Sequence, residues 1–139
     1  MLTKRDRIVI DTLIPSNAHP VLKLGAFDAG FDEFEKDFSQ NAVFSMKLGF
    51  WFGLFLAIWV APLLILRLPP ITLYNRETRE RAFMALYNSR LYVFRQMALL
   101  LKATICFGYG ANPDVRDAIG YPRQFDDPRG PLPKKGGAA

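Results

Sequence analysis

The chain has 139 residues, a net charge of +5 and a single cysteine, so it can form one modest domain but no internal disulfide. Cationic residues cluster in three separate segments, 4–7, 67–102 and 123–135, whereas acidic residues dominate 28–37. No aromatic-basic RNA motif or zinc-finger spacing is visible, and we therefore expect no nucleic-acid partner. The divided charge favours orientation against a membrane or docking on a partner protein.

Residue types that carry catalysis are sparse. The single histidine, His19, precedes Pro20 in a predicted loop, and the single cysteine, Cys106, lies in an apolar helical run where we expect a buried, inert thiol. The glycine pair Gly108 and Gly110 lacks the third glycine and the preceding strand of a dinucleotide site. The sequence therefore predicts no catalytic, cofactor-binding or metal-binding residue, and a chain that is not itself an enzyme.

The first predicted helix begins after Thr3, which can form a weak capping box with Asp6. Val9 and Leu13 fall on one face of this helix, and Pro15 ends it. Residues 15–25 contain prolines, an asparagine, a serine and a glycine, and are typical of a loop.

Four phenylalanines then recur at helical spacing, at positions 27, 31, 34 and 38. The favoured interpretation is an amphipathic helix with an aromatic core face, and the alternative is a stripe docked on a partner or on lipid. The acidic residues Asp32, Glu33 and Glu35 could bind a cation, but their pattern is more typical of a solvated helix face.

An uncharged apolar run of 19 residues extends from Leu48 to Leu66, flanked by Lys47 and Arg67. As a helix it is roughly 28 Å long, close to the thickness of a bilayer's hydrocarbon core. We therefore predict a membrane-embedded helix over residues 43–67, because the chain has too few other apolar elements to cover it alone. The alternative is a helix covered by protein, which also requires a partner. The predicted membrane residues are Leu48, Phe50, Phe52, Leu54, Leu56, Ile58, Leu63 and Ile65.

Two residues of this run leave open whether the helix crosses the membrane or only dips into it. Trp59 lies near the middle of the run, whereas tryptophan is usual at the membrane interface. Pro62 lacks a backbone donor and should kink the helix.

The C-terminal half predicts a long helix from Arg76 to Phe107, capped by Asn75 and ended by the glycine pair. A short helix then opens at Asn112 and Pro113 and ends at Gly120. No stretch alternates as a strand, so we predict an all-α bundle in one domain, residues 1–122, followed by a flexible or partner-bound tail, residues 123–139, rich in proline and glycine. The buried face of the long helix is predicted to comprise Phe83, Tyr87, Leu91, Phe94, Ala98, Leu101 and Ile105, and the short helix is predicted to turn Val115 and Ile119 inward.

Several of these segments resemble a known family. Arg79-Glu80-Arg81, Ser89-Arg90-Leu91, Leu101-Lys102-Ala103 and the stretch from Asn112 to Pro122 resemble the small-subunit family typified by gluconate 2-dehydrogenase subunit 3, as does the opening segment from Asp11 to Pro15. Similar segments precede the flavin domain in long-chain alcohol oxidases of the glucose-methanol-choline (GMC) class. The resemblance implies an all-helical, non-catalytic accessory subunit that binds a large FAD-dependent GMC oxidoreductase.

In that family the large subunit holds the FAD and the catalytic histidine, and electrons can pass to a cytochrome or a quinone. This chain lacks the twin-arginine signal of exported relatives, and its middle helix is more apolar, which implies that the subunit itself is the membrane anchor, in the bacterial inner membrane. The alternative is a structural single-helix subunit of another membrane complex, respiratory or photosynthetic. The predicted partner-binding residues are Arg90, Phe94, Asn112, Pro113, Val115, Ile119, Gly120 and Tyr121.

Overall fold

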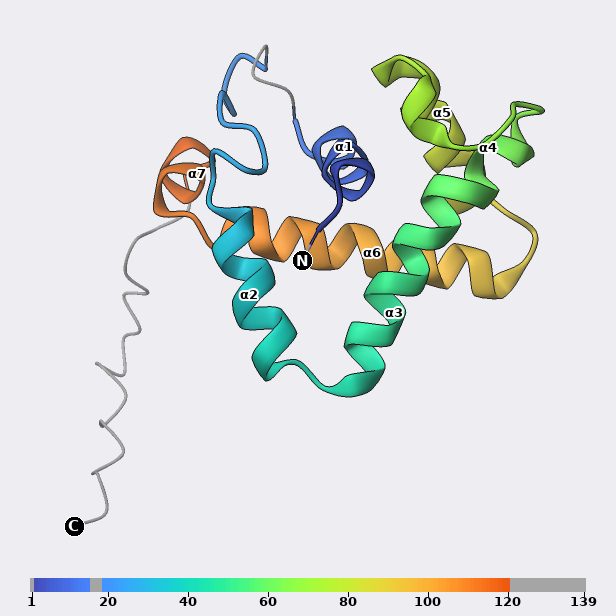
Figure 1. Ribbon diagram of the computed structural model, residues 1–139. Helices are drawn as coiled ribbons and strands as arrows, with labels where there is room; N and C mark the ends of the chain where they lie inside the picture. The colour runs from blue at the N-terminus through green and yellow to red at the C-terminus, as the bar shows by residue number, and fades with distance from the viewer. Residues whose placement is uncertain (1, 16–18, 121–139) are drawn as a thin grey trace.

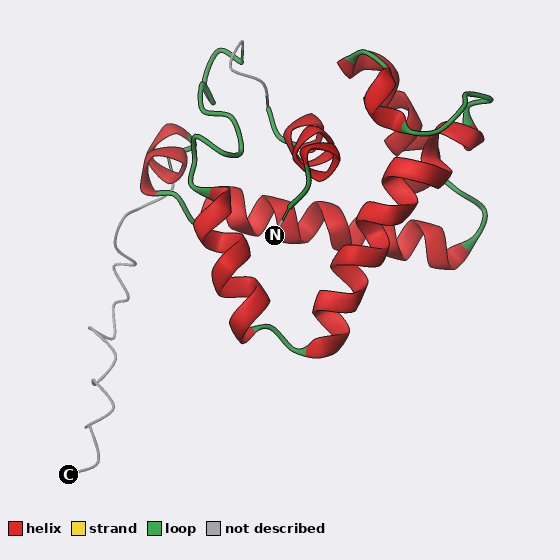
Figure 2. Ribbon diagram, in the orientation of Figure 1, coloured by secondary structure: helices red, strands yellow, loops and turns green. Residues whose placement is uncertain are grey.

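The computed structural model describes residues 2–15 and 19–120, and within them all regular structure is helical (Figure 2). The prediction of an all-α fold is therefore confirmed for this part of the chain. The predicted tail, residues 123–139, and Tyr121 lie outside the described residues.

The helices pack around α6, which runs across the molecule and is contacted by α1, α2, α3, α5 and α7 (Figure 1). Their buried apolar side chains form one hydrophobic core. In chain order the elements are α1 (Lys4–Leu13), α2 (Phe31–Asn41), α3 (Phe44–Phe55), the π-helical turn η1 (Leu56–Val60), α4 (Ala61–Leu64), the 3-10 turn η2 (Ile71–Leu73), α5 (Arg76–Tyr87), α6 (Tyr92–Gly110) and α7 (Pro113–Ala118).

The start of α1 is the predicted capping box. The Thr3 hydroxyl accepts a hydrogen bond from the Asp6 amide at 3.3 Å, and the Asp6 carboxylate accepts one from the Thr3 amide at 2.7 Å. These bonds satisfy donors that would otherwise lack a partner at the helix end. The helix then buries Val9 and Ile10 in the core.

The four phenylalanines pack into the core, which confirms the interpretation of this stripe as a core face, but α2 begins only at Phe31 and Phe27 lies in the turn before it. Phe31 is fully buried, and its ring lies 5.4 Å from that of Phe34. A Cβ atom at Gly108 would lie 2.7 Å from the Phe31 ring, so only glycine allows this approach. Gly108 therefore lies inside α6 and does not end it, contrary to the prediction; the helix ends at Gly110.

The apolar run folds as one continuous helix, Phe44–Leu64, formed by α3, η1 and α4. Among the described residues it is the one helix long and apolar enough to cross a membrane, by length and composition. It is shorter than the predicted 43–67 helix at both ends. At its C-terminal end, Leu66 adopts a left-handed backbone conformation, with φ of 57°, that a helix cannot continue through.

The irregularity expected at Pro62 takes the form of the π-helical turn η1. The Ala61 amide donates to the Leu56 carbonyl, five residues back, instead of four. A proline ring crowds the carbonyl four residues earlier and supplies no N–H, and a wider turn before it relieves both constraints.

The prediction of one long helix from Arg76 to Phe107 is wrong, because the chain breaks between α5 and α6. Ser89 accounts for the break: its amide donates to the Leu86 carbonyl at 3.2 Å, and its hydroxyl accepts from the Leu91 amide at 3.2 Å. A serine side chain that bonds the local backbone competes with the helix. As a result Leu91 is exposed and does not belong to the buried face.

Candidate interaction surfaces

The eight predicted membrane residues divide between two faces of the 44–64 helix and its C-terminal end. Phe50, Leu54, Leu56 and Ile58 are buried by the chain itself, so these four side chains do not face lipid. Ile65, which follows α4, is partly buried. The exposed members are Leu48, Phe52 and Leu63.

Two glycines explain how the chain covers one side of this helix. A Cβ atom at Gly53 would lie 3.0 Å from Leu101 Cβ and 3.2 Å from the Met97 carbonyl oxygen, and one at Gly49 would lie 2.5 Å from Leu100 Cδ2. The absence of side chains at both positions lets α3 approach α6 closely. The expectation that the chain cannot cover this helix alone is therefore wrong for one face and holds for the other.

The opposite face of the helix forms a continuous apolar surface, which we call the exposed stripe. Its members recur every three or four residues along the helix, apart from the neighbours Trp51 and Phe52, and this is the spacing of one helical face. Phe44 at the start is 76% exposed, and the rings of Phe52 and Phe55 are stacked, with centroids 6.4 Å apart. The stripe comprises Phe44, Leu48, Trp51, Phe52, Phe55, Trp59 and Leu63.

The stripe continues into the segment from Leu64, the last residue of α4, to Leu73, which we call the leucine loop. Leu66, at the left-handed position, is 95% exposed. The Arg67 guanidinium lies 5.9 Å from the centroid of the Tyr74 ring, and the Tyr74 hydroxyl donates to the Leu68 carbonyl at 2.9 Å. The exposed leucines of the loop are Leu64, Leu66, Leu68 and Leu73. The loop therefore presents leucines and a cation together at the surface.

The predicted partner-binding residues do not form one site. Arg90 and Phe94 lie at the start of α6, whereas Asn112 follows its end. A helix of 19 residues is about 28 Å long, so the two groups lie on opposite sides of the molecule (Figure 1). Only the residues of the second group, from Asn112 onward, lie close to one another.

Within that second group, two residues act inside the fold. The Asn112 side chain caps α7 by accepting from the Asp114 amide at 2.8 Å, and it donates to the Ala29 carbonyl at 3.1 Å. Val115 is buried as predicted. Pro113, at the first position of α7, is exposed. These contacts hold α7 against the turn before α2.

The end of α6 and the outer side of α7 enclose an open groove of about 460 Å³, which we call the α6–α7 groove. Phe107 and Ile119 present their side chains here, so the prediction that Ile119 turns inward is wrong. Cys106 is also exposed, contrary to the expected buried thiol. Gly120, two residues after α7, has a φ of 71°, a backbone angle that a larger residue would resist. The groove is lined by Cys106, Phe107, Gly110, Ala111, Arg116 and Ile119.

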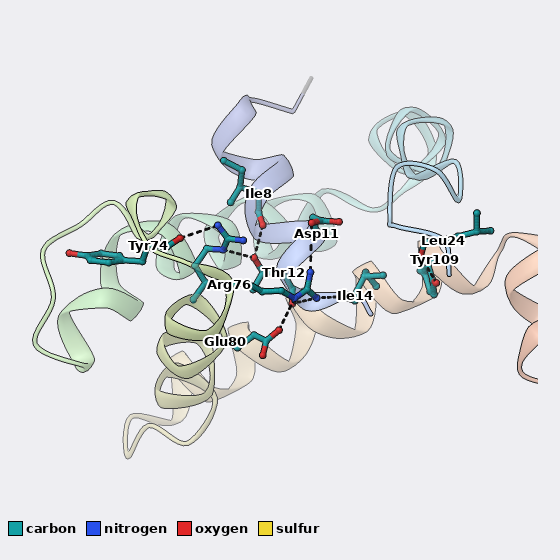
Figure 3. A network of polar contacts seen from close by, with 10 residues as sticks. Ile8, Asp11, Thr12, Ile14, Leu24, Tyr74, Arg76, Glu80 and Tyr109 are labelled. Carbon is teal, nitrogen blue, oxygen red and sulfur yellow. Dashed lines mark hydrogen bonds and ion pairs between the residues drawn. The ribbon is translucent and has the colours of Figure 1, made fainter. Parts of the chain in front are cut away.

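Partly buried polar contacts join α1 to α5 (Figure 3). Arg76 donates to the carbonyls of Ile14 and Thr12 at the C-terminal end of α1, and its Nε donates to Glu80 at 2.9 Å. Its guanidinium also lies 3.8 Å from the Asp11 carboxylate. A cation at this position satisfies carbonyls that have no partner within the helix.

Arg79 makes a second connection between the same helices. Its Nε donates to the Thr12 hydroxyl at 2.8 Å and its Nη1 to the Tyr74 carbonyl at 3.1 Å. Burial, and to a smaller extent the charge of Arg76, lower the pKa of Arg79. The side chains of Arg76 and Arg79, which belong to the basic segment 67–102, are thus both bonded within the fold.

Asp32, Glu35 and His19, candidates in the sequence, have partners within the chain. The Asp32 carboxylate forms an ion pair with Arg7 at 2.6 Å, and the His19 ring accepts from the Leu22 amide at 3.0 Å. Within residues 2–15 and 19–120, no three His, Cys, Asp or Glu side chains lie close enough together to hold a metal ion.

Comparison with known proteins adds no relative. No protein-family model, curated protein or solved structure matches this chain. The surfaces that support a proposal of function are the exposed stripe, the leucine loop and the α6–α7 groove.

Proposed function

We propose that the chain is a non-catalytic accessory subunit that attaches a partner enzyme to a membrane. The observation that carries this proposal is the exposed stripe, an apolar surface of aromatic and aliphatic side chains along a helix whose other face is core. Contiguous apolar surface of this extent is unusual in a monomeric soluble protein and marks contact with lipid or with protein.

The partner in this proposal is the FAD-dependent large subunit of a GMC-type alcohol dehydrogenase, and the membrane is the bacterial inner membrane. The resemblance of the segment from Asn112 to Pro122 supports this partner class. The α6–α7 groove supports docking at the same end of the molecule, since exposed Phe107 and Ile119 offer the large apolar anchors that dominate binding interfaces.

The groove and the stripe have separate tasks in this arrangement. The stripe contacts lipid, while the groove binds the flavoprotein, which brings FAD and the catalytic histidine. An enzyme held at the bilayer surface can take an apolar alcohol from the lipid and pass electrons to a membrane quinone or a cytochrome. In this proposal the chain itself positions the flavoprotein at the bilayer and offers a complementary surface for it to bind.

Aspartate at both Phe107 and Ile119 is expected to reduce recovery of the flavoprotein with the tagged chain by at least tenfold. Each change removes an exposed apolar anchor and adds a charge to the groove, and a loss of about 1.4 kcal/mol already corresponds to tenfold. The measurement is the flavin absorbance of material purified on the tag, normalised to the amount of the chain.

The control is Met84→Asp, which places one such negative charge on an exposed apolar position of α5, away from the groove. It should leave recovery of the flavoprotein unchanged, and circular dichroism of both variants should match the unaltered chain. Equal recovery with the groove variant and the control would contradict docking at the groove.

A further inference from the structure

We infer that the 44–64 helix lies in the plane of the membrane surface and does not cross the bilayer. In this arrangement the exposed stripe and the leucine loop enter the boundary between headgroups and acyl chains of anionic lipid. The inference deepens the proposed function and rests on its membrane attachment. Length and apolar composition alone do not distinguish a helix in the membrane plane from one that crosses the bilayer, because both need the same uncharged run.

Charged elements packed against the middle of the helix argue against a crossing orientation. Helices α1 and α5 both contact η1. Arg79 of α5 lines a small cavity together with Ala57 of η1, and the Arg5 guanidinium of α1 lies 5.6 Å from the centroid of the Trp59 ring. Two arginines therefore lie at the level of η1.

The position of η1 along the helix determines how deep Arg5 and Arg79 would lie if the helix crossed the bilayer. The centre of the helix is at Leu54, and Ala57 and Trp59 lie only about 4.5 Å and 7.5 Å further along its axis. Half the hydrocarbon core measures about 15 Å, so an upright helix would carry Arg5 and Arg79 into it. Arginine at that depth is far more unfavourable than any apolar residue of the run is favourable. With the helix in the membrane plane, Arg79 lies on the side away from the lipid.

The tryptophans fit the in-plane orientation. Trp51 and Trp59 both belong to the exposed stripe, and tryptophan side chains favour the headgroup level of a bilayer. In an upright helix Trp59 would lie deep in the hydrocarbon. In a helix parallel to the surface, every residue of the stripe lies at the same shallow depth, which is the level that tryptophan prefers.

The distribution of charged residues favours anionic lipid as the molecule that this surface contacts. No acidic residue occurs between Asp37 and Glu77, whereas Lys47 and Arg67 lie at the two ends of the apolar run. Arg67 is exposed in the leucine loop between two exposed leucines, Leu66 and Leu68. The leucines can enter the acyl region while the guanidinium contacts lipid phosphate, and basic residues near an anionic surface strengthen attachment.

Cysteine labelling tests the orientation. The full chain is used with its native thiol removed by Cys106→Ser. A single cysteine then replaces either Lys36 on α2, which precedes the 44–64 helix in sequence, or Glu77 on α5, which follows it. Both positions are exposed. Sealed vesicles of one orientation, prepared from expressing cells, are treated with an impermeant maleimide before and after permeabilisation. We expect both positions to react under the same condition, because both halves of the chain lie on one side of the membrane.

Opposite sidedness, with one position reacting before permeabilisation and the other only after it, would overturn the in-plane inference and leave the proposed membrane attachment standing. Recovery of the chain in the soluble fraction would overturn both. The lipid preference is tested by flotation of the purified chain with phosphatidylcholine vesicles, with and without phosphatidylglycerol. We expect at least fivefold stronger binding to the anionic vesicles, which corresponds to one cation near the surface, and equal binding would contradict the assignment to anionic lipid.

Discussion

Changing both Phe52 and Phe55 to aspartate is expected to move the chain from the membrane fraction to the soluble fraction. Both side chains are exposed in the middle of the stripe. Each change removes lipid contact and adds a charge, and a loss of only about 1.4 kcal/mol per position lowers membrane partitioning a hundredfold for the pair. Fractionation of cell extracts followed by detection of the tagged chain measures the effect.

The matched control is the pair Val93→Asp and Leu99→Asp on α6, which are exposed apolar positions outside the stripe. This pair should leave the chain in the membrane fraction, and neither pair should change the helical content measured by circular dichroism. If the stripe variant stays with the membrane, the stripe does not hold the chain there.

The second large effect is expected inside the same helix, where Leu56→Arg should abolish folding. Leu56 is 2% exposed and belongs to the core where η1 meets α1, α5 and α6. An unpaired charge buried at such a site costs several kcal/mol, a large part of the roughly 5–15 kcal/mol that stabilises a typical domain. We expect the variant to accumulate poorly or to lose its cooperative thermal transition.

Leu48→Arg is the control for this change, because Leu48 lies on the same helix with 58% of its side chain exposed. It should leave the thermal transition within a few degrees of the unaltered chain and act on membrane attachment alone. Equal stability of the two arginine variants would show that η1 is not part of the core.

Local signals in the sequence predicted the starts of α1 and α7 and the aromatic core face of α2. The capping box of Thr3, the cap supplied by Asn112 and the phenylalanine spacing of α2 all depend on residues within a turn or two of one another. The break at Ser89 also has a local cause, yet the apolar spacing continues through it, so the pattern favoured one helix over two.

The division of the apolar helix into two faces was not predictable from the run itself. A segment without charged residues has no polar side to mark its outer face, and the choice depends on where α6 packs. Gly49 and Gly53 carry a signal, since a glycine pair four residues apart permits close helix contact, but it does not identify the partner.

The α6–α7 groove was not predicted, because the sequence pattern was not interpreted as exposing Cys106 and Phe107. Cys106 follows Lys102 by four residues and so continues the outer, basic face of α6, a spacing that conflicts with its interpretation as buried. The sequence predicts that the helix ends at Phe107, whereas it continues to Gly110 and leaves Phe107 exposed on its surface.

The central claim, that the chain attaches a flavoprotein to the membrane, is tested most directly by purifying the tagged chain from its native membranes. The measurement is the visible absorption spectrum of the purified material before and after addition of reductant, together with dye-linked alcohol dehydrogenase activity. We predict the bands of oxidised flavin, bleached on reduction, in the same fractions as the chain. Copurification with other membrane proteins and no flavin would contradict the flavoprotein partner and favour a structural subunit of a respiratory or photosynthetic complex.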